Sequence, residues 1–162
     1  MKYFFVLFLL CFGYSTYAQH AGKNNLSVEV LGAGGWWSAN YERKVFTKKL
    51  AALHVRAGLG TYRFRDYELK LNPDITIPVA AHFLYGKKHK LDLSIGQTLS
   101  NIVQLQSSTM EKKRIISLSA FAGVGYRYQS TKGLMLRISY IPMIEYYQHF
   151  RHWAGVSVGY TF

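Results

Sequence analysis

The sequence predicts an all-β protein: an eight-stranded antiparallel up-and-down transmembrane β-barrel preceded by a cleaved signal peptide. Three observations lead to this prediction. Eight segments alternate between apolar residues and small or polar ones, short links alternate with long links between them, and aromatic residues gather toward both ends of the segments. Alternation by itself fits a soluble sandwich as well as a membrane barrel, so the other two observations and the composition of the second face must distinguish them.

Residues 1–18 have the pattern of a secretory signal peptide. A basic start, an apolar run at 4–12 and a small-x-small end predict cleavage after Ala18. The run is shorter than the ~20 apolar residues that a membrane-spanning helix needs. Cys11 is interpreted as part of this run and not as a lipid-modified cysteine, because that modification requires a small preceding residue and a leucine stands there. Residues 19–162 are then expected to form one outer-membrane β-barrel domain.

The composition excludes several classes of function. Cys11 is the only cysteine, so the chain after the signal peptide has no disulfide, no thiolate nucleophile and no zinc–thiolate site. The 20 Lys and Arg residues against 8 Asp and Glu give a formal charge of +12. A basic excess suggests nucleic acid at first, but a secreted chain meets anionic lipid instead, so no nucleic-acid partner is expected. No long window has helical spacing of apolar residues.

The first four expected strands span 26–30, 37–45, 53–60 and 75–85. Every second residue in them is mostly apolar, which gives each strand two different faces. The residues of the second face are Ser27 and Glu29; Ser38, Asn40, Glu42 and Lys44; His54, Arg56, Gly58 and Gly60; and Thr76, Pro78, Ala80, His82 and Leu84.

The last four expected strands span 91–96, 117–128, 134–141 and 152–162. They alternate in the same way, and the even number of strands brings both ends of the barrel to one side of the membrane. The residues of their second face are Asp92, Ser94 and Gly96; Ser117, Ser119, Phe121, Gly123, Gly125 and Arg127; Met135, Arg137, Ser139 and Ile141; and Trp153, Gly155, Ser157, Gly159 and Thr161.

This second face suits the inside of a narrow barrel better than water. It is rich in Gly, Ser and Ala, and an eight-stranded barrel has an interior with room only for side chains. Its three acidic residues are matched by its three arginines, as a closed interior requires, because unpaired buried ions are costly. We therefore expect a lumen charge network made of Glu29, Glu42, Arg56, Asp92, Arg127 and Arg137.

The links and the aromatic residues support the membrane barrel. Short links are expected at 47–49, 86–89 and 129–133, long polar ones at 63–74, 100–114 and 142–151, and Gly32–Gly35 is tight. Outer-membrane barrels have short periplasmic turns and longer outer loops, with an aromatic belt at each interface. The expected belts are Tyr85, Tyr126, Tyr128, Tyr160 and Phe162 at the short-turn end, and Trp36, Trp37, Tyr62, Tyr140, Tyr146, Tyr147 and Trp153 at the other.

The chain resembles the small eight-stranded outer-membrane barrels of the OmpA-like and OmpW-like kind, and more closely a group of short barrels common in Bacteroidota. The resemblance lies in the Ala-Gln signal end, in 31–43, in 83–91, in 125–129 and in 153–162. It implies insertion by the barrel assembly machinery, which would read Tyr160 and Phe162 as its assembly signal. It implies no agreed activity, so no cofactor and no catalytic residue is carried over.

The histidines do not form a convincing catalytic site. His54 and His82 are expected as hydrogen-bonded interior residues, and His149 and His152 lie near the last loop with Glu145. Small outer-membrane acyl hydrolases carry Ser, His and an acid at the outer rim, but Ser157 is expected well below His152. Likewise, Gly32–Gly35 leads into a strand where a phosphate-binding loop would need a helix. The chain is therefore predicted not to be an enzyme.

The predicted role is that of an integral outer-membrane protein with structural or surface-interaction duties. Its expected partners are outer-membrane lipids and lipopolysaccharide, besides the assembly machinery, and no oligomeric state is predicted. Eight strands leave no room for a conducting pore. The alternatives are a small outer-leaflet lipid-modifying enzyme and a secreted soluble β-domain. The candidate lipopolysaccharide contacts are Arg63, Arg65, Lys112, Lys113 and Arg114.

Overall fold

The computed structural model describes residues 22–64, 72–105, 112–145 and 150–162. Within these ranges, the side chains of residues 103–105, 112–113 and 145 are not described. The predicted signal peptide lies outside the described residues. In the described part of the chain, no helix has the length and apolar character needed to cross a membrane.

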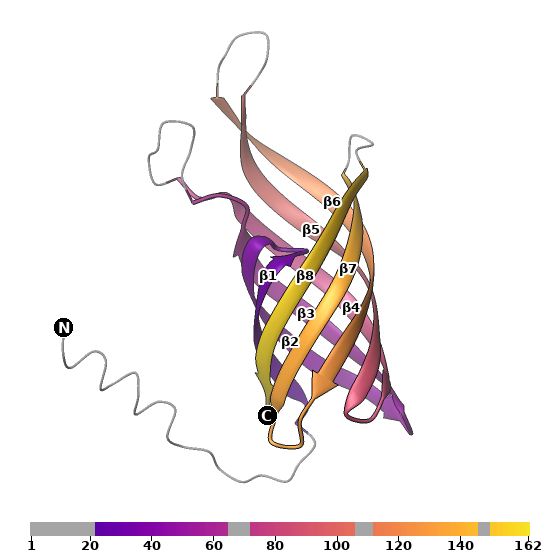
Figure 1. Ribbon diagram of the computed structural model, residues 1–162. Coiled ribbons are helices and arrows are strands. Elements are labelled where there is room, and N and C mark those ends of the chain that lie inside the picture. Colours follow the sequence, from indigo (N-terminus) through magenta and orange to yellow (C-terminus); the bar gives the residue numbers. More distant parts are fainter. Residues whose placement is uncertain (1–21, 65–71, 106–111, 146–149) are drawn as a thin grey trace, which may run out of the picture.

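The strands form a closed barrel in which each strand pairs antiparallel with the next and β8 pairs back with β1, as Figure 1 shows. The fold class predicted from the sequence is thus confirmed. Val28 of β1, for example, lies between Ala39 of β2 and Val158 of β8. The strands are β1 (Asn24–Gly32), β2 (Gly35–Lys48), β3 (Ala51–Thr61), β4 (Ile75–Gly86), β5 (His89–Leu105), β6 (Lys112–Gln129), β7 (Leu134–Glu145) and β8 (Phe150–Thr161).

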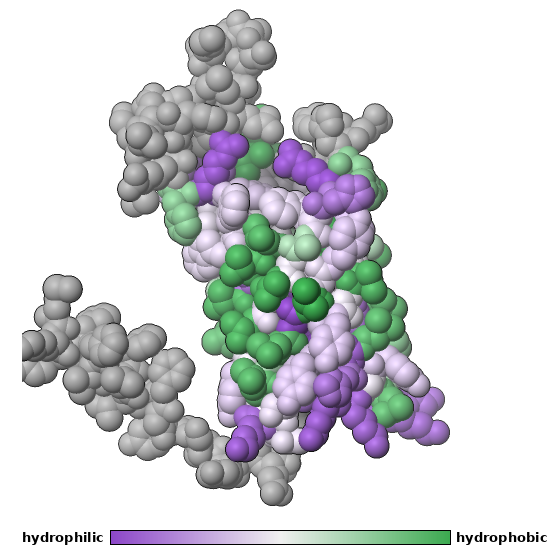
Figure 2. Space-filling view, viewed as in Figure 1, coloured by the Kyte–Doolittle hydropathy of each residue, from purple (hydrophilic) through white to green (hydrophobic). Residues whose placement is uncertain are grey.

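The two faces of the wall reverse the arrangement of a soluble protein. Large apolar side chains such as Ile95, Val156 and Leu59 point outward, with at least 59% of their surface exposed. On the face that Figure 2 shows, hydrophobic residues in green gather at the middle height of the barrel, and hydrophilic residues in purple lie toward both ends. The fully buried residues are mostly polar or charged. Such an apolar band belongs in lipid, so the alternative of a soluble β-domain is wrong.

The turns follow the predicted order, but two loops are shorter than predicted. β2 and β3 are joined through residues 49–50, β4 and β5 through 87–88, and β6 and β7 through 130–133. At the other end, β5 and β6 stay paired as far as Leu105 and Lys112, so Lys112, Lys113 and Arg114 lie in a strand and not in a loop. The last link also shortens, to 146–149. These extensions mix polar and apolar residues without regular alternation, as in Lys112-Lys113-Arg114-Ile115-Ile116, so apolar periodicity does not detect them.

The tip of the β1–β2 hairpin folds into the barrel. Ala33 is completely buried, Thr76 Oγ1 donates a hydrogen bond of 2.6 Å to the Gly34 carbonyl, and Thr98 Oγ1 donates one of 2.8 Å to the Ala33 carbonyl. Both threonines belong to the inner face of the opposite wall. The tight turn predicted at Gly32–Gly35 is therefore a structural part of the lumen.

An apolar layer crosses the lumen at this height. We call it the upper layer; it consists of Ala33, Ala80, Phe121, Ile141 and Met143, with Trp153 packed against it. The sequence placed Trp153 both on the second face of the last strand and in the aromatic belt at the long-loop end, and the structure confirms the first assignment and not the second. Trp153 shares the inner face of β8 with Gly155 and Ser157, and its ring lies 6.4 Å from that of Tyr62. Its height along the strand was predicted correctly, but the alternation places it inside.

Candidate functional site in the lumen

Six charged side chains meet in the lumen below the upper layer. Glu29, Glu42, Arg56, Asp92, Arg127 and Arg137 come from β1, β2, β3, β5, β6 and β7, and none is more than 4% exposed. Each of them belongs to the alternate residues of its strand that point inward. Because the barrel is closed, these inward side chains from different strands meet in the lumen. The structure thus gathers all six residues that the sequence assigned to the lumen.

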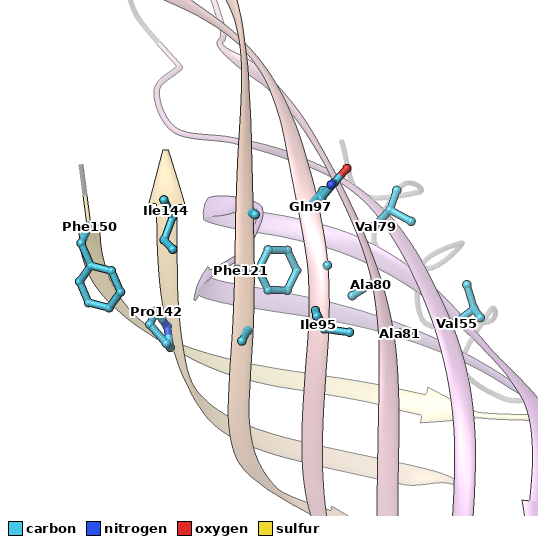
Figure 3. A pocket seen from close by; sticks show the side chains of 13 residues that line it. Val55, Val79, Ala80, Ala81, Ile95, Gln97, Phe121, Pro142, Ile144 and Phe150 are labelled. Atoms are coloured by element: carbon cyan, nitrogen blue, oxygen red, sulfur yellow. The ribbon is translucent and has the colours of Figure 1, made fainter. Parts of the chain in front are cut away.

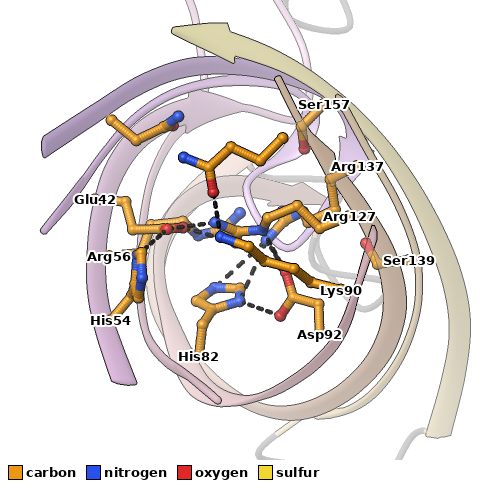
Figure 4. A network of polar contacts seen from close by, with 12 residues as sticks. Glu42, His54, Arg56, His82, Lys90, Asp92, Arg127, Arg137, Ser139 and Ser157 are labelled. Atoms are coloured by element: carbon orange, nitrogen blue, oxygen red, sulfur yellow. Dashed lines mark hydrogen bonds and ion pairs between the residues drawn. The ribbon is translucent and has the colours of Figure 1, made fainter. Parts of the chain in front are cut away.

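Arg127 joins the two sides of the barrel. Its two terminal nitrogens contact both carboxylate oxygens of Glu42, at 2.5 and 2.9 Å. Its Nε donates a hydrogen bond of 2.9 Å to Asp92 Oδ2. A bidentate arginine–carboxylate pair is strong and geometrically specific, so this contact fixes β6 against β2 across the lumen (Figure 4).

Glu29 forms a second centre. Arg56 Nη1 lies 3.2 Å from Glu29 Oε2, Arg137 Nη2 pairs with Oε1, and the Ser157 hydroxyl donates to Oε1 at 3.3 Å. Arg137 also connects the two centres, because its Nη1 lies 3.9 Å from Asp92 Oδ2. One network therefore holds strands on all sides of the barrel.

Two histidines belong to this network. His54 Nδ1 lies 2.7 Å from Glu42 Oε1, and His82 Nδ1 lies 2.7 Å from Asp92 Oδ1. His82 also faces Arg137 Nη1 at 3.4 Å. With His82 from β4 and Ser157 from β8, every strand supplies at least one group to the network. The sequence predicted that both histidines point inward, because they alternate with the apolar residues of their strands. It did not identify them as partners of the carboxylates.

A polar layer closes the short-turn end of the lumen. Lys90 Nζ donates to Gln129 Oε1, and Gln129 Nε2 donates to Thr161 Oγ1 at 2.9 Å. Asn25 Nδ2 reaches the same hydroxyl at 2.8 Å. The lumen thus carries three kinds of layer in succession: neutral polar groups with one lysine, the ionic network, and the apolar upper layer. None of these side chains was singled out from the sequence as a group.

The site has no evident nucleophile. The Ser157 hydroxyl donates to Glu29 inside the barrel, whereas His152 lies on the opposite face of β8 and contacts the Tyr140 hydroxyl. Among the described residues, no serine hydroxyl is hydrogen-bonded to a histidine and no three His, Cys, Asp or Glu side chains are grouped to hold a metal. His149 lies outside the described residues. The arrangement can hold strands together and fill the lumen.

The remaining candidate residues lie at the two ends of the barrel. Arg63 is exposed beyond β3, and exposed Arg114 donates to Asn72 and, at 3.3 Å, to the Pro73 carbonyl. Arg65 lies outside the described residues, and the side chains of Lys112 and Lys113 are not described. Tyr160 and Phe162 are both at least half exposed at the short-turn end, where Phe162 exchanges backbone hydrogen bonds with Asn24.

Comparison with known proteins identifies the fold alone. No family model matches the chain, and no curated protein matches it. The N-terminal β-barrel domain of Pseudomonas aeruginosa OprF has a TM-score of 0.57 at 18% identity, over 87% of this chain and 99% of that one. The Yersinia pestis outer membrane protein Ail has a TM-score of 0.55 at 11% identity, over 87% and 99%. The outer membrane enzyme PagL reaches only 0.44 at 12% identity, over 86% and 99%.

The chain therefore has the fold of eight-stranded outer-membrane barrels. This fold and the apolar band on its outside place the protein in an outer membrane. The resemblance to the Bacteroidota group stays a prediction from the sequence.

Proposed function

We propose that the protein is a closed, non-catalytic outer-membrane barrel that acts through its outer end, as a structural or surface-interaction protein that binds lipopolysaccharide there. The observation that carries this proposal is the filled lumen. Among the described residues, the ionic network and the upper layer both cross it, which argues against a wide water-filled path or a substrate cavity inside. What is left for function is the outer surface.

The charge at the long-loop end supports lipopolysaccharide as the partner. Arg63 and Arg114 are exposed there, and Arg151 is exposed at the start of β8. Basic residues at the level of lipid headgroups are attracted to phosphate, and each contributes roughly 1 kcal/mol near an anionic surface. Insertion itself is assigned to the barrel assembly machinery, with Tyr160 and Phe162 as the contact that it reads.

Lipopolysaccharide capture tests this proposal. The double variant Arg63→Gln/Arg114→Gln removes two charges at the long-loop end and is expected to weaken capture by about thirty-fold. The matched control is Lys87→Gln/Lys88→Gln, which removes two exposed charges at the short-turn end and is expected to change nothing. Equal capture by both double variants and the native protein would refute binding at the outer end.

The alternative of a lipid-modifying enzyme has its own test. His152 is the one described histidine near the last loop, and its ring contacts Tyr140 and Phe150 on the outside of the wall. We expect His152→Ala to leave the acyl chains of lipid A unchanged when whole cells are analysed by mass spectrometry. A changed acyl profile that is restored by the native gene would show an enzyme.

A further inference from the structure

The lipid-facing wall contains a groove that was not predicted from the sequence. It lies across the outside of β4, β5, β6 and β7, with Val55 of β3 and Phe150 of β8 at its two sides, has a volume of about 730 Å³, and is shown in Figure 3. Small residues form its floor, namely Ala81, Gly96, Ala120 and Ala122. Larger side chains, among them Val79 and Phe150, form its rim. Elsewhere the outer face carries mostly Val, Leu, Ile and Tyr, so the hollow follows from small residues on adjacent strands.

An interruption in the pairing of β6 with β7 lies within this groove. β6 and β7 pair at Phe121–Met143 and again at Val124–Tyr140, but the two positions between them are not paired. Pro142 lies in this gap, and proline has no N–H to donate to a ladder. The ring of Phe121 also lines the groove, and it packs so closely under Gly96 of β5 that a Cβ there would lie 2.7 Å from Phe121 Cζ.

Gln97 is the one polar side chain that lines the groove. It points outward between Val79 and Ala120, and it makes no hydrogen bond to another described residue. An amide without a partner in hydrocarbon costs several kcal/mol, because no water is available to replace the lost hydrogen bond. A ligand that carries a carbonyl group beside an apolar chain would satisfy it.

The position of the groove indicates which lipid supplies that chain. The groove lies toward the long-loop end, because Phe150, the first residue of β8, is one of its lining residues. An exposed cation, Arg114, lies above the groove on the same outward face of β6 as Ala120 and Ala122. An acyl chain in the groove would therefore continue into a headgroup that meets positive charge.

We propose that the groove binds one acyl chain of lipopolysaccharide, with Gln97 donating a hydrogen bond to the ester or amide carbonyl that links the chain to its sugar. This inference rests on the lipopolysaccharide contact proposed above and adds a second contact, between the wall of the barrel and an acyl chain of the same lipid. The headgroup contact uses the arginines of the outer end, whereas the chain contact uses the wall between β4 and β7.

Site-specific photocrosslinking in intact outer membranes tests the groove. p-Benzoylphenylalanine replaces either Val79, on the rim, or Val28, which is on β1 outside the groove and has the same 47% exposure. After irradiation, adducts with lipopolysaccharide and with phospholipid are separated and measured by mass spectrometry. We expect at least a five-fold excess of lipopolysaccharide adducts at Val79. Equal adducts at the two positions, or adducts mainly with phospholipid, would overturn the proposal.

Variants that fill the groove test its shape. Ala122→Leu, combined with p-benzoylphenylalanine at position 79, places a larger side chain on the floor and is expected to abolish the excess of lipopolysaccharide adducts. Gln97→Leu in the same protein is expected to reduce this excess. Ala39→Leu is the matched control, since Ala39 faces outward on β2 and lies outside the groove. Only the folded, heat-modifiable species is measured, and Ala122→Val is used if Ala122→Leu does not fold. An excess that persists in the filled variants would overturn the proposal.

The two lipopolysaccharide proposals fail separately. If Ala122→Leu loses the lipopolysaccharide crosslinks but Arg63→Gln/Arg114→Gln still captures lipopolysaccharide normally, only the headgroup contact is refuted. Reduced capture in the arginine variant with equal crosslinking at Val79 and Val28 would refute only the groove.

Discussion

Arg127 illustrates how single residues keep charge inside this barrel. A buried ion is stable only when its partners satisfy it, and Arg127 has two carboxylate partners at hydrogen-bonding distance. Its position on the inner face was predictable, because Gly123, Gly125 and Arg127 are alternate residues of one strand and therefore share a face. Its pairing with Glu42 was not, because Glu42 is 85 residues away and lies on a strand that is not its neighbour.

Removal of Arg127 should be strongly destabilising. Arg127→Met leaves Glu42 and Asp92 as buried carboxylates that have lost their strongest partner, so we expect a loss of about 3–5 kcal/mol in the free energy of unfolding. Urea-induced unfolding in lipid vesicles measures this value. Arg43→Met is the control, because exposed Arg43 is next to Glu42 in the sequence but on the outer face, and it should change little.

A double variant separates the network from simple packing. Glu42→Gln in the Arg127→Met background neutralises one of the two abandoned carboxylates, so part of the lost stability should return. If the double variant is less stable than Arg127→Met by the full cost of Glu42→Gln alone, the two residues are not energetically coupled and the network contributes less than its geometry indicates.

At the scale of elements, strand cores were more predictable than strand ends. β4 and β7 alternate cleanly, because one face meets lipid and the other meets the lumen. The ends of β5 and β6 pair up to Leu105 and Lys112, where this contrast between the two faces is lost. The hairpin between β1 and β2 was recognised as a turn, but its fold into the lumen depends on Thr76 and Thr98, which are distant in sequence.

The inward hairpin should loosen when its two side-chain hydrogen bonds are removed. Thr76→Val/Thr98→Val keeps the shape of both side chains but leaves the carbonyls of Ala33 and Gly34 without their donors. Each lost bond to a buried carbonyl costs roughly 1–3 kcal/mol. Amide hydrogen exchange across residues 32–36 should therefore accelerate by about ten-fold or more.

The control for the hairpin is Thr47→Val, an exposed position at the opposite end of β2. It should leave exchange at 32–36 unchanged. Unaltered exchange in the Thr76→Val/Thr98→Val variant would mean that packing of Ala33 alone holds the hairpin in place.

At the scale of the whole molecule, the lumen is closed twice in series. On β6, Phe121 of the upper layer lies six residues from Arg127 of the ionic network, which is roughly 20 Å along the strand. On β7, Met143 and Arg137 are separated in the same way. A path for ions needs both barriers to open, so a change in either layer alone should leave the barrel closed.

Single-channel recording in planar bilayers tests this arrangement. The native protein should show no steady large conductance, and neither should Arg127→Ser, which weakens the ionic network, nor Phe121→Ser/Met143→Ser, which opens the upper layer. Only the combined triple variant should conduct, because it interrupts both barriers at once. Steady conductance in Arg127→Ser alone would show that the upper layer does not seal the lumen, and that the ionic network is the one barrier in the barrel.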